Sequence, residues 1–360
     1  MDIKSILIPF VLLFIGCSSD DEVGTGSEAN SLEIVNDYSY NDLLSLIGED
    51  KLGIAVEKPA ANGALGRNRG SYFHVRFQLA MSSVSDFAIT TTRTDALEQF
   101  VNTVEYSFNH QLDGGNFEFS PPAELLNSPD YQPPSEGDLV SATAFFASSL
   151  GIALLSLETS PWYTSSSEAQ QFKEEVAMYS LPIEKTLDYL ISKQHILLQY
   201  DAKAPNRLLF DALAYYCLGK YLERTDAQTV GFEFIEAALD LIDQQQGYFI
   251  EGGGWDSSYN GVALKLAMEL FTFVEEETMK GNLKGAITRA AEWQLSRIDN
   301  SGKISTDGNT RVYPGGEAFL GTEKGVDYAK TVKALYYFGY LTNNPEVIKI
   351  GDSVLSYYEQ

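Results

Sequence analysis

The sequence predicts an all-α protein, an α/α toroid in which about five to six helix hairpins form an incomplete or complete ring. Apolar residues recur at helical spacing along most of the 360 residues. The helical segments fall into pairs that are unequally spaced and lie farther apart than the roughly 34 residues of a solenoid repeat. Long glycine-rich loops join these pairs, and long loops at one end of a scaffold are where sites are usually built.

The periodic segments predict helices in order along the chain. The stretch from residue 50 to 92 carries the weakest helical pattern, and Ser71–Ala80 fits a strand as well as a helix. The turns between the pairs share a loose sequence pattern, in which a Gln is followed by Asp or Gly and then by an apolar residue. Three turns show this pattern: 111–117, 246–249 and 294–304. The predicted helices are 40–48, 72–84, 94–111, 138–157, 168–196, 206–222, 228–246, 257–276, 282–298, 324–341 and 345–358.

The N-terminus has the pattern of an export signal. Lys4 precedes the uncharged run Ile6–Ile15, and Gly16-Cys17 follows it. This run is too short for a bilayer span, which needs roughly 20 residues. The segment resembles a bacterial lipoprotein signal, in which the cysteine is lipidated, although an ordinary signal peptide with a chance cysteine is the alternative. We therefore expect a signal peptide at 1–16, an acidic flexible tether at 17–35 and a single domain at 36–360.

The run Ser18–Glu22 is rich in acidic residues and resembles the tag that sends Bacteroidota lipoproteins to the outer face of the outer membrane. A generic acidic linker is the alternative. The resemblance implies a protein anchored in the cell outer membrane through Cys17 and facing the exterior. It also implies other outer-membrane glycan-uptake proteins as partners.

The net charge is −25, from 50 acidic and 25 basic residues. Such a surface repels nucleic acid and anionic lipid headgroups, so neither is an expected partner. An anionic substrate remains compatible with this charge if the few basic residues cluster in the site. With Cys17 lipidated, Cys217 has no disulfide partner within the chain.

The stretch Gly247–Gly261 combines aromatic residues, a glycine run and Asp-x-x-Tyr at a helix start. It resembles the loops on the catalytic face of α/α-toroid carbohydrate-active enzymes, such as polysaccharide lyases and unsaturated glucuronyl hydrolases. The resemblance implies a polysaccharide-degrading enzyme. The favoured reaction is a lyase acting on a uronic-acid-containing glycan of the alginate or ulvan type. A glycoside hydrolase, a non-catalytic glycan-binding lipoprotein and a solenoid that binds protein partners are the alternatives.

Four residues are candidate catalytic groups. Tyr259 and His110 are the types of side chain that carry the proton transfers of a lyase, whereas Glu251 and Asp256 could be the two carboxylates of a hydrolase. Each has a structural alternative. Asp256 could cap a helix, and His110 could complement the C-terminal end of a helix dipole. Helix capping is also the simplest role for three other aspartates placed near helix starts: Asp138, Asp211 and Asp327.

Candidate substrate-binding residues lie in two loops, 247–261 and 307–328, which we expect to form a cleft. Aromatic rings could stack on sugars, and Arg311 could pair bidentately with a substrate carboxylate, although a salt bridge explains it equally well. The histidines are scattered and no paired cysteines occur, so the sequence predicts neither a metal site nor a cofactor. The candidate binding residues are Trp255, Asn260, Arg311, Tyr313 and Asp327.

Overall fold

A computed structural model of the protein describes residues 32–52, 58–129, 131–319 and 322–359. The predicted signal peptide, Cys17 and most of the predicted tether lie outside the described residues. The folded unit begins at Leu32, four residues before the predicted boundary at residue 36. Ile34 is already buried in the core, and the backbone N–H of Val35 donates to the carbonyl of Leu341.

The fold is helical, as predicted. The helices are α1 (Tyr40–Ile47), α2 (Glu49–Leu52), α3 (Met81–Thr91), α4 (Thr94–Phe108), α5 (Ala123–Leu126), α6 (Glu136–Glu158), α7 (Pro161–Ser165), α8 (Gln170–Ala177), α9 (Ser180–Tyr200), α10 (Pro205–Tyr221), α11 (Thr225–Leu239), α12 (Ser257–Phe273), α13 (Glu277–Ser296), α14 (Tyr328–Leu341) and α15 (Pro345–Tyr358). Two short antiparallel two-stranded sheets pair β1 (Phe73–His74) with β2 (Phe119–Ser120), and β3 (Ala318–Phe319) with β4 (Thr322–Glu323).

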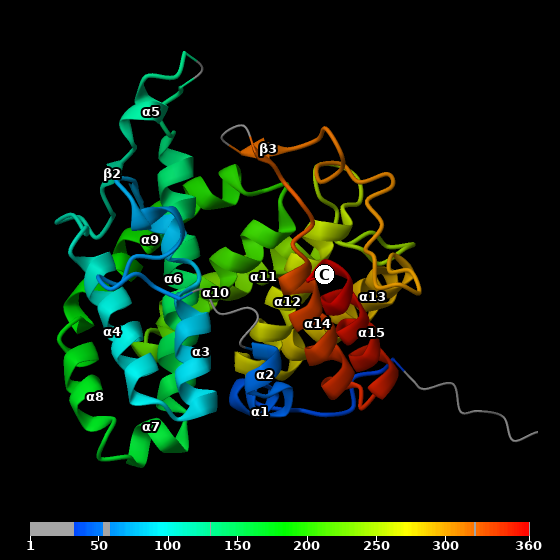
Figure 1. The fold of residues 1–360 in the computed structure, drawn as a ribbon, viewed down its shortest axis with the longest axis horizontal. Coiled ribbons are helices and arrows are strands. Elements are labelled where there is room, and N and C mark those ends of the chain that lie inside the picture. The colour runs from blue at the N-terminus through cyan, green and yellow to red at the C-terminus, as the bar shows by residue number, and fades with distance from the viewer. Residues whose placement is uncertain (1–31, 53–57, 130, 320–321, 360) are drawn as a thin grey trace, which may run out of the picture. The chain divides into compact units, whose positions relative to one another are not determined.

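Ten of the described helices pack as five antiparallel hairpins around a common centre (Figure 1). The inner helices follow one another around the ring in the order α3, α6, α10, α12 and α14, and each pairs with an outer helix: α4, α9, α11, α13 and α15. Most side chains of α6, α10, α12 and α14 are buried, whereas the outer helices bury one face. The predicted α/α toroid is therefore confirmed, as an incomplete ring of five hairpins.

Helix α1 lies in the gap between the two ends of this ring (Figure 1). The hydroxyl of Tyr40 on α1 donates to Asp86 on α3 at 2.9 Å. Lys333 on α14 forms an ion pair with the same carboxylate, also at 2.9 Å. The ring of Tyr40 also stacks on Phe273, with the ring centroids 5.1 Å apart. Residues from the beginning, the middle and the end of the chain thus form one polar seam, which joins the first and last inner helices.

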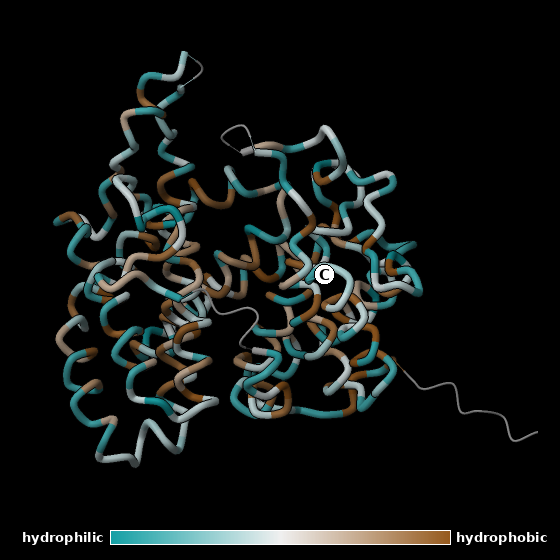
Figure 2. The backbone as a smooth tube through the Cα atoms, viewed as in Figure 1, coloured by the Kyte–Doolittle hydropathy of each residue, from teal (hydrophilic) through white to brown (hydrophobic). Residues whose placement is uncertain are grey.

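The inner helix α6 is long and apolar enough to cross a membrane by length and composition alone. Its side chains are instead buried against α3, α9 and α10, as expected for the central helix of a large core. The hydropathy along the backbone agrees, because hydrophobic stretches recur along the packed helices and many of the connecting turns are hydrophilic (Figure 2).

The predicted repeat in the turns corresponds to a repeated structure. In three connections the chain forms an isolated antiparallel bridge: Gln111 with Phe117, Ile242 with Phe249, and Ile298 with Ile304. Each turn contains a glycine with a φ of +86° to +89° that sits against the backbone of the next outer helix. A Cβ on Gly302, for example, would lie 2.1 Å from the carbonyl oxygen of Ser353. The same arrangement occurs at Gly63, Gly115 and Gly247.

Three local predictions are wrong. The helix predicted at 168–196 is two helices, α8 and α9. The segment 72–84 is not one helix: a two-residue strand, a 3-10 turn (η2, Val75–Gln78) and then α3 from Met81 share it, because Gln78 turns inward and binds the loop before it. Asp211 does not begin a helix, because α10 starts at Pro205. Its carboxyl lies inside the protein, where burial and the neighbouring Asp201 raise its pKa well above the usual value.

Candidate active site

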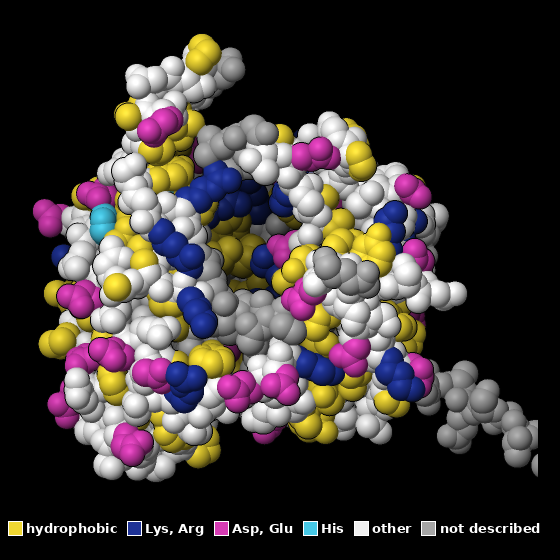
Figure 3. All heavy atoms as spheres, viewed as in Figure 1, with side chains coloured by type: hydrophobic (Ala, Val, Ile, Leu, Met, Phe, Trp, Pro, Cys, Tyr) yellow, Lys and Arg dark blue, Asp and Glu magenta, His cyan; other side chains and the backbone are white. Residues whose placement is uncertain are grey.

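The inner helices surround a hollow with a cavity volume of about 390 Å³, within the size range of small-molecule sites. Lys and Arg side chains border its opening, and most acidic side chains on this face lie farther out (Figure 3). Residues from α3, α6, α10, α12 and α14 all reach the cavity. The cavity is therefore the centre of the toroid itself.

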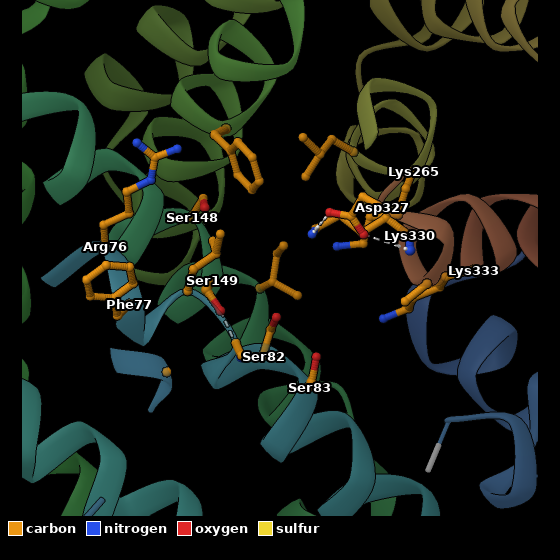
Figure 4. Close-up of a pocket in the computed structure, with 17 residues that line it drawn as sticks. Arg76, Phe77, Ser82, Ser83, Ser148, Ser149, Lys265, Asp327, Lys330 and Lys333 are labelled. Carbon is orange, nitrogen blue, oxygen red and sulfur yellow. Dashed lines mark hydrogen bonds and ion pairs between the residues drawn. The ribbon is translucent and has the colours of Figure 1, made fainter. Parts of the chain in front are cut away.

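The charged lining of the cavity is strongly unbalanced. Arg76, Lys265, Lys330 and Lys333 line it, and among the described lining residues Asp327 is the sole acid. Arg76 approaches from one wall and the lysines from the opposite wall (Figure 4). The chain has twice as many acidic as basic residues. An anionic ligand therefore requires the basic residues to cluster in the site, and in this cavity they do.

The three lysines are held in place by carboxylates, of which Glu269 and Asp86 are buried and Asp327 is half-buried. Lys265 Nζ donates to Glu269 one helical turn along α12, at 2.7 Å, and Lys330 pairs with Asp327. Lys333 pairs with Asp86. Burial lowers the pKa of Lys265, and the charge of Lys333 acts in the same direction, while Glu269 opposes both. Lys265 is therefore a cation that loses its proton more readily than a lysine in water.

The rest of the lining mixes hydroxyl groups with apolar surface. Ser82, Ser83, Ser148 and Ser149 lie along one side (Figure 4). Ser149 Oγ accepts the backbone N–H of Ser82 at 2.8 Å, so its own hydrogen remains available to a ligand. The apolar lining comprises Phe77, Leu79, Ala80, Ile152, Phe210, Leu266 and Ala329. Such a lining can bind both the hydroxyl groups and the apolar face of a sugar.

The two loops that the sequence predicted to form a cleft are in contact. Asp256 joins them: one carboxylate oxygen accepts the N–H groups of Ser258 and Tyr259, and the other accepts those of Arg311 and Val312. Asp256 is thus the N-cap of α12 and also a bridge to the second loop. Its four acceptor positions are filled, which leaves none for a substrate. Helix capping, the alternative weighed for this residue, is what the geometry supports.

Tyr259 lies in a cluster of hydrogen-bonded and ion-paired side chains that come from both loops. Its hydroxyl donates to Glu317 at 2.7 Å and accepts from Lys324 at 2.5 Å. The Arg311 guanidinium stands over the Tyr259 ring, 4.4 Å from its centroid, and pairs with Glu251 at 2.5 Å and with Glu317 at 3.0 Å. Burial, followed by the bond to Glu317, raises the pKa of Tyr259. The phenol is therefore held protonated, and Arg311 is occupied by two carboxylates.

Electrostatics connect this cluster to the cavity. Enclosure by protein and the charge of Arg207 lower the pKa of Arg76 in the cavity wall, whereas Tyr259 acts in the opposite direction. Burial is likewise the main cause of the raised pKa of Glu251, which Arg311 opposes. Asp327, which lines the cavity, donates its backbone N–H to the hydroxyl of Ser258 at 2.9 Å, so the cluster around Tyr259 and the cavity lining border one another.

The remaining candidate binding residues have different surroundings. Asn260 is fully buried: its amide donates to Ala290 and Gln294 and accepts the N–H of Phe249. Trp255 is half-buried beside Tyr248, and Tyr313 is exposed. Asp327 is the N-cap of α14 and lines the cavity. Asp327 alone among the five predicted binding residues belongs to the described cavity lining.

His110 lies away from the cavity lining. Its Nδ1 is 2.8 Å from the carbonyl oxygen of Tyr106, its ring stacks on Phe73 at 3.9 Å between centroids, and its Nε2 is 3.6 Å from a Glu118 oxygen. This is the position near a helix C-terminus that its structural alternative describes.

Sequence reasoning missed the basic residues of the cavity: Arg76, Lys265, Lys330 and Lys333. A signal for the lysines exists, since each interrupts the apolar pattern of an inner helix, and Lys265 has a glutamate four residues later. No comparable signal marks Arg76. Among the described residues, no group of three or more His, Cys, Asp or Glu side chains could hold a metal ion.

The fold belongs to the α/α-toroid class, and comparison with solved structures agrees. The chain is similar to a D-mannose isomerase, with a TM-score of 0.51 and 12% sequence identity, over 89% of this chain and 87% of that one. A cellobiose 2-epimerase from Spirochaeta thermophila DSM 6192 also matches, with a TM-score of 0.40 and 12% identity, over 85% and 78% of the two chains. No model of a known protein family and no curated protein sequence matches significantly.

Proposed function

We propose that this protein is a carbohydrate-active enzyme that binds a sugar carrying a carboxylate in its central cavity. The substrate class is a uronic-acid-containing glycan, such as an alginate- or ulvan-like chain. The observation that carries the proposal is the basic lining of the cavity in a strongly acidic chain. The toroidal fold, which a sugar isomerase shares, and the serine and apolar lining support it, although fold likeness alone does not establish an activity.

The reaction we propose is β-elimination. Removing the proton next to a carboxylate builds negative charge on that carboxylate, and fixed cations lower the energy of this state. Lys265 is the proposed base, because burial makes its neutral amine accessible. The proton at C5 passes to Lys265 Nζ, the electron pair forms the C4–C5 double bond, and the C4–O bond breaks.

Tyr259 is the proposed acid that protonates the leaving oxygen. Its raised pKa keeps the proton on the phenol, and Lys324, which donates to the same oxygen, can restore that proton after the reaction. Tyr259 and Lys265 lie six residues apart on α12, about 9 Å along the helix axis. Over six residues the helix turns by about 600°, so the two side chains leave α12 about 120° apart, and we propose that the glycan extends from the cavity to the Tyr259 cluster and contacts both.

The test is to mix the purified domain with polyuronates and follow absorbance near 235 nm. Growth of this band, which reports the new double bond, supports the proposal. Reducing ends without the band would indicate the hydrolase alternative. Binding of a sugar acid with neither product would indicate a non-catalytic glycan-binding protein. No binding and no product with any member of the panel would overturn the proposal.

We also propose that the domain is tethered to the cell outer membrane through a lipid on Cys17, facing the exterior, where glycan-uptake proteins would be its partners. The support is the sequence pattern of residues 4–22. Cells expressing the full chain or Cys17→Ser would be labelled with radioactive palmitate. Label in the parent and none in the variant is expected, together with protease sensitivity of the parent on intact cells. Equal labelling of both would contradict lipidation at Cys17.

A further inference from the structure

Arg76 differs from the other basic residues of the cavity in having no acidic partner. Lys265, Lys330 and Lys333 each form an ion pair with a carboxylate. Within the described parts of the chain, no carboxylate lies within ion-pair distance of the Arg76 guanidinium. Its recorded contact is the ring of Phe145, with Cζ 4.5 Å from the centroid.

A second arginine and its acidic partner lie near Arg76. Arg207 lowers the pKa of Arg76, and Asp201 acts in the opposite direction, but the Asp201 carboxylate is paired with Arg207 at 3.0 Å. The Arg76 side chain is exposed to solvent inside the hollow. A guanidinium remains charged at all physiological pH values, so Arg76 is a permanent cation, and no described carboxylate lies within ion-pair distance of it.

The backbone that carries Arg76 is firmly held. Arg76 lies in η2 between two buried residues, Val75 and Gln78. The Gln78 amide accepts the N–H of Leu65 at 2.8 Å and donates to the carbonyl of Gly63 at 3.3 Å. The guanidinium is therefore presented from a fixed base, which reduces the entropy lost on binding a ligand.

We propose that Arg76 is the residue that recognises the carboxylate of the sugar bound in the cavity. Its ring contact covers one face of the guanidinium and leaves the in-plane N–H groups free for bidentate hydrogen bonds to a carboxylate. The lysines act on the rest of the sugar from the opposite wall (Figure 4). Arg311, the carboxylate-binding residue expected from the sequence, is already paired with Glu251 and Glu317. This inference rests on the proposed function, since it takes the ligand to be a sugar acid.

The test measures binding by calorimetry, with D-glucuronate and alginate-derived uronic-acid oligosaccharides as charged probes and D-glucose as the neutral probe. Arg76→Gln should bind the sugar acids about 10- to 100-fold more weakly than the parent, because it loses charge-assisted hydrogen bonds. Arg76→Lys should fall between the two, since a lysine keeps the charge but not the bidentate geometry. Any affinity for glucose should be the same in all variants.

Arg224→Gln is the matched control. It makes the same change in charge on the connection between α10 and α11, where Arg224 pairs with Asp188 and Asp226, and it should bind sugar acids as the parent does. Equal binding by Arg76→Gln and the parent, with both folded by circular dichroism, would overturn the inference. So would an absence of sugar-acid binding by the parent.

The two proposals fail in different ways. Arg76-dependent binding without any product leaves the inference intact and removes the proposed reaction. Turnover that does not depend on Arg76 removes the inference and leaves the reaction.

Discussion

The central cavity and the loop cluster around Tyr259 differ in how their charges are satisfied. In the cluster, Arg311 pairs with both Glu251 and Glu317, and Asp256 accepts four backbone N–H groups. In the cavity, four basic side chains meet one acid among the described lining residues. Ion pairs between the loop residues hold the two loops together, whereas the excess of positive charge in the cavity can attract an anionic ligand.

The loop residues are conspicuous in the sequence because they form a motif, whereas the cavity residues are brought together only by the fold. The loop 247–261 draws attention in the sequence because glycines, aromatics and acids are adjacent there. In the structure Asn260 and Asp256 accept backbone N–H groups of the two loops, and Glu251 pairs with Arg311. The cavity lysines stand singly on apolar helices, and only the curvature of the ring places them together.

Replacing Lys265 by Gln should have the largest effect on activity. Loss of a general base lowers rates by about 10²- to 10⁴-fold, and the rate of the parent should rise with pH to a plateau below the ordinary lysine pKa of 10.5, since the pKa of Lys265 is lowered. Initial rates at 235 nm across pH would measure both effects. A variant with parental rates and an unchanged pH profile would remove Lys265 from the mechanism.

Replacing Lys333 by Met should produce the largest loss of stability. The variant leaves the buried Asp86 carboxylate without its ion-pair partner, and breaking a buried pair in this way costs about 3–5 kcal/mol of unfolding free energy. Denaturant unfolding would measure it. Lys349→Met, which removes an exposed pair with Glu346, is the control and should change stability by less than about 1 kcal/mol. Equal stabilities of the two variants would show that the seam contributes little.

Replacing Asp256 by Ala tests whether this residue is structural or catalytic. As a cap it should lower the free energy of unfolding by about 2–4 kcal/mol, since a cap contributes up to about 2 kcal/mol and buried N–H groups left unpaired cost about 1–3 kcal/mol more. Activity per folded molecule should persist well below the melting temperature. Complete loss of activity in a variant that unfolds like the parent would move the reacting site to the loops.

The smallest effect concerns the titration of His74, two residues before Arg76. Burial lowers its pKa to about 4, and the charge of Arg76 contributes to the shift. Because the folded protein favours the neutral imidazole, the contribution of His74 should lower the free energy of unfolding as the pH falls from 6.5 toward 4. Arg76→Gln should raise the pKa of His74 by a fraction of a unit in an NMR titration. An unchanged value would indicate that the two groups do not interact.

The fold could be predicted further than the site. Helical periodicity located most of the helices, and the repeated turns in the sequence indicated hairpins. The turns repeat because the glycine of each turn packs against the backbone of the next outer helix, where a side chain does not fit. The break within the predicted helix 72–84 was missed because Gln78 and the η2 turn are fixed by distant residues such as Ser107. The sequence also identified Asp327, which lines the cavity. The role of Arg76 could not be predicted from the sequence. It depends on the lack of an ion-pair partner among the described residues, which only the assembled ring reveals.

The seam between α1 and α14 imposes an order on folding. Tyr40 and Lys333 meet on Asp86 across separations of 46 and 247 residues, so this three-residue junction cannot form until Lys333 has been made. Contacts between such distant residues form slowly, because closing long loops costs entropy before any contact compensates for it. The hairpins can assemble one after another as the chain emerges, but the contact between α1 and α14 forms only after α14 has been made. The cavity therefore acquires its final shape only when the last hairpin docks.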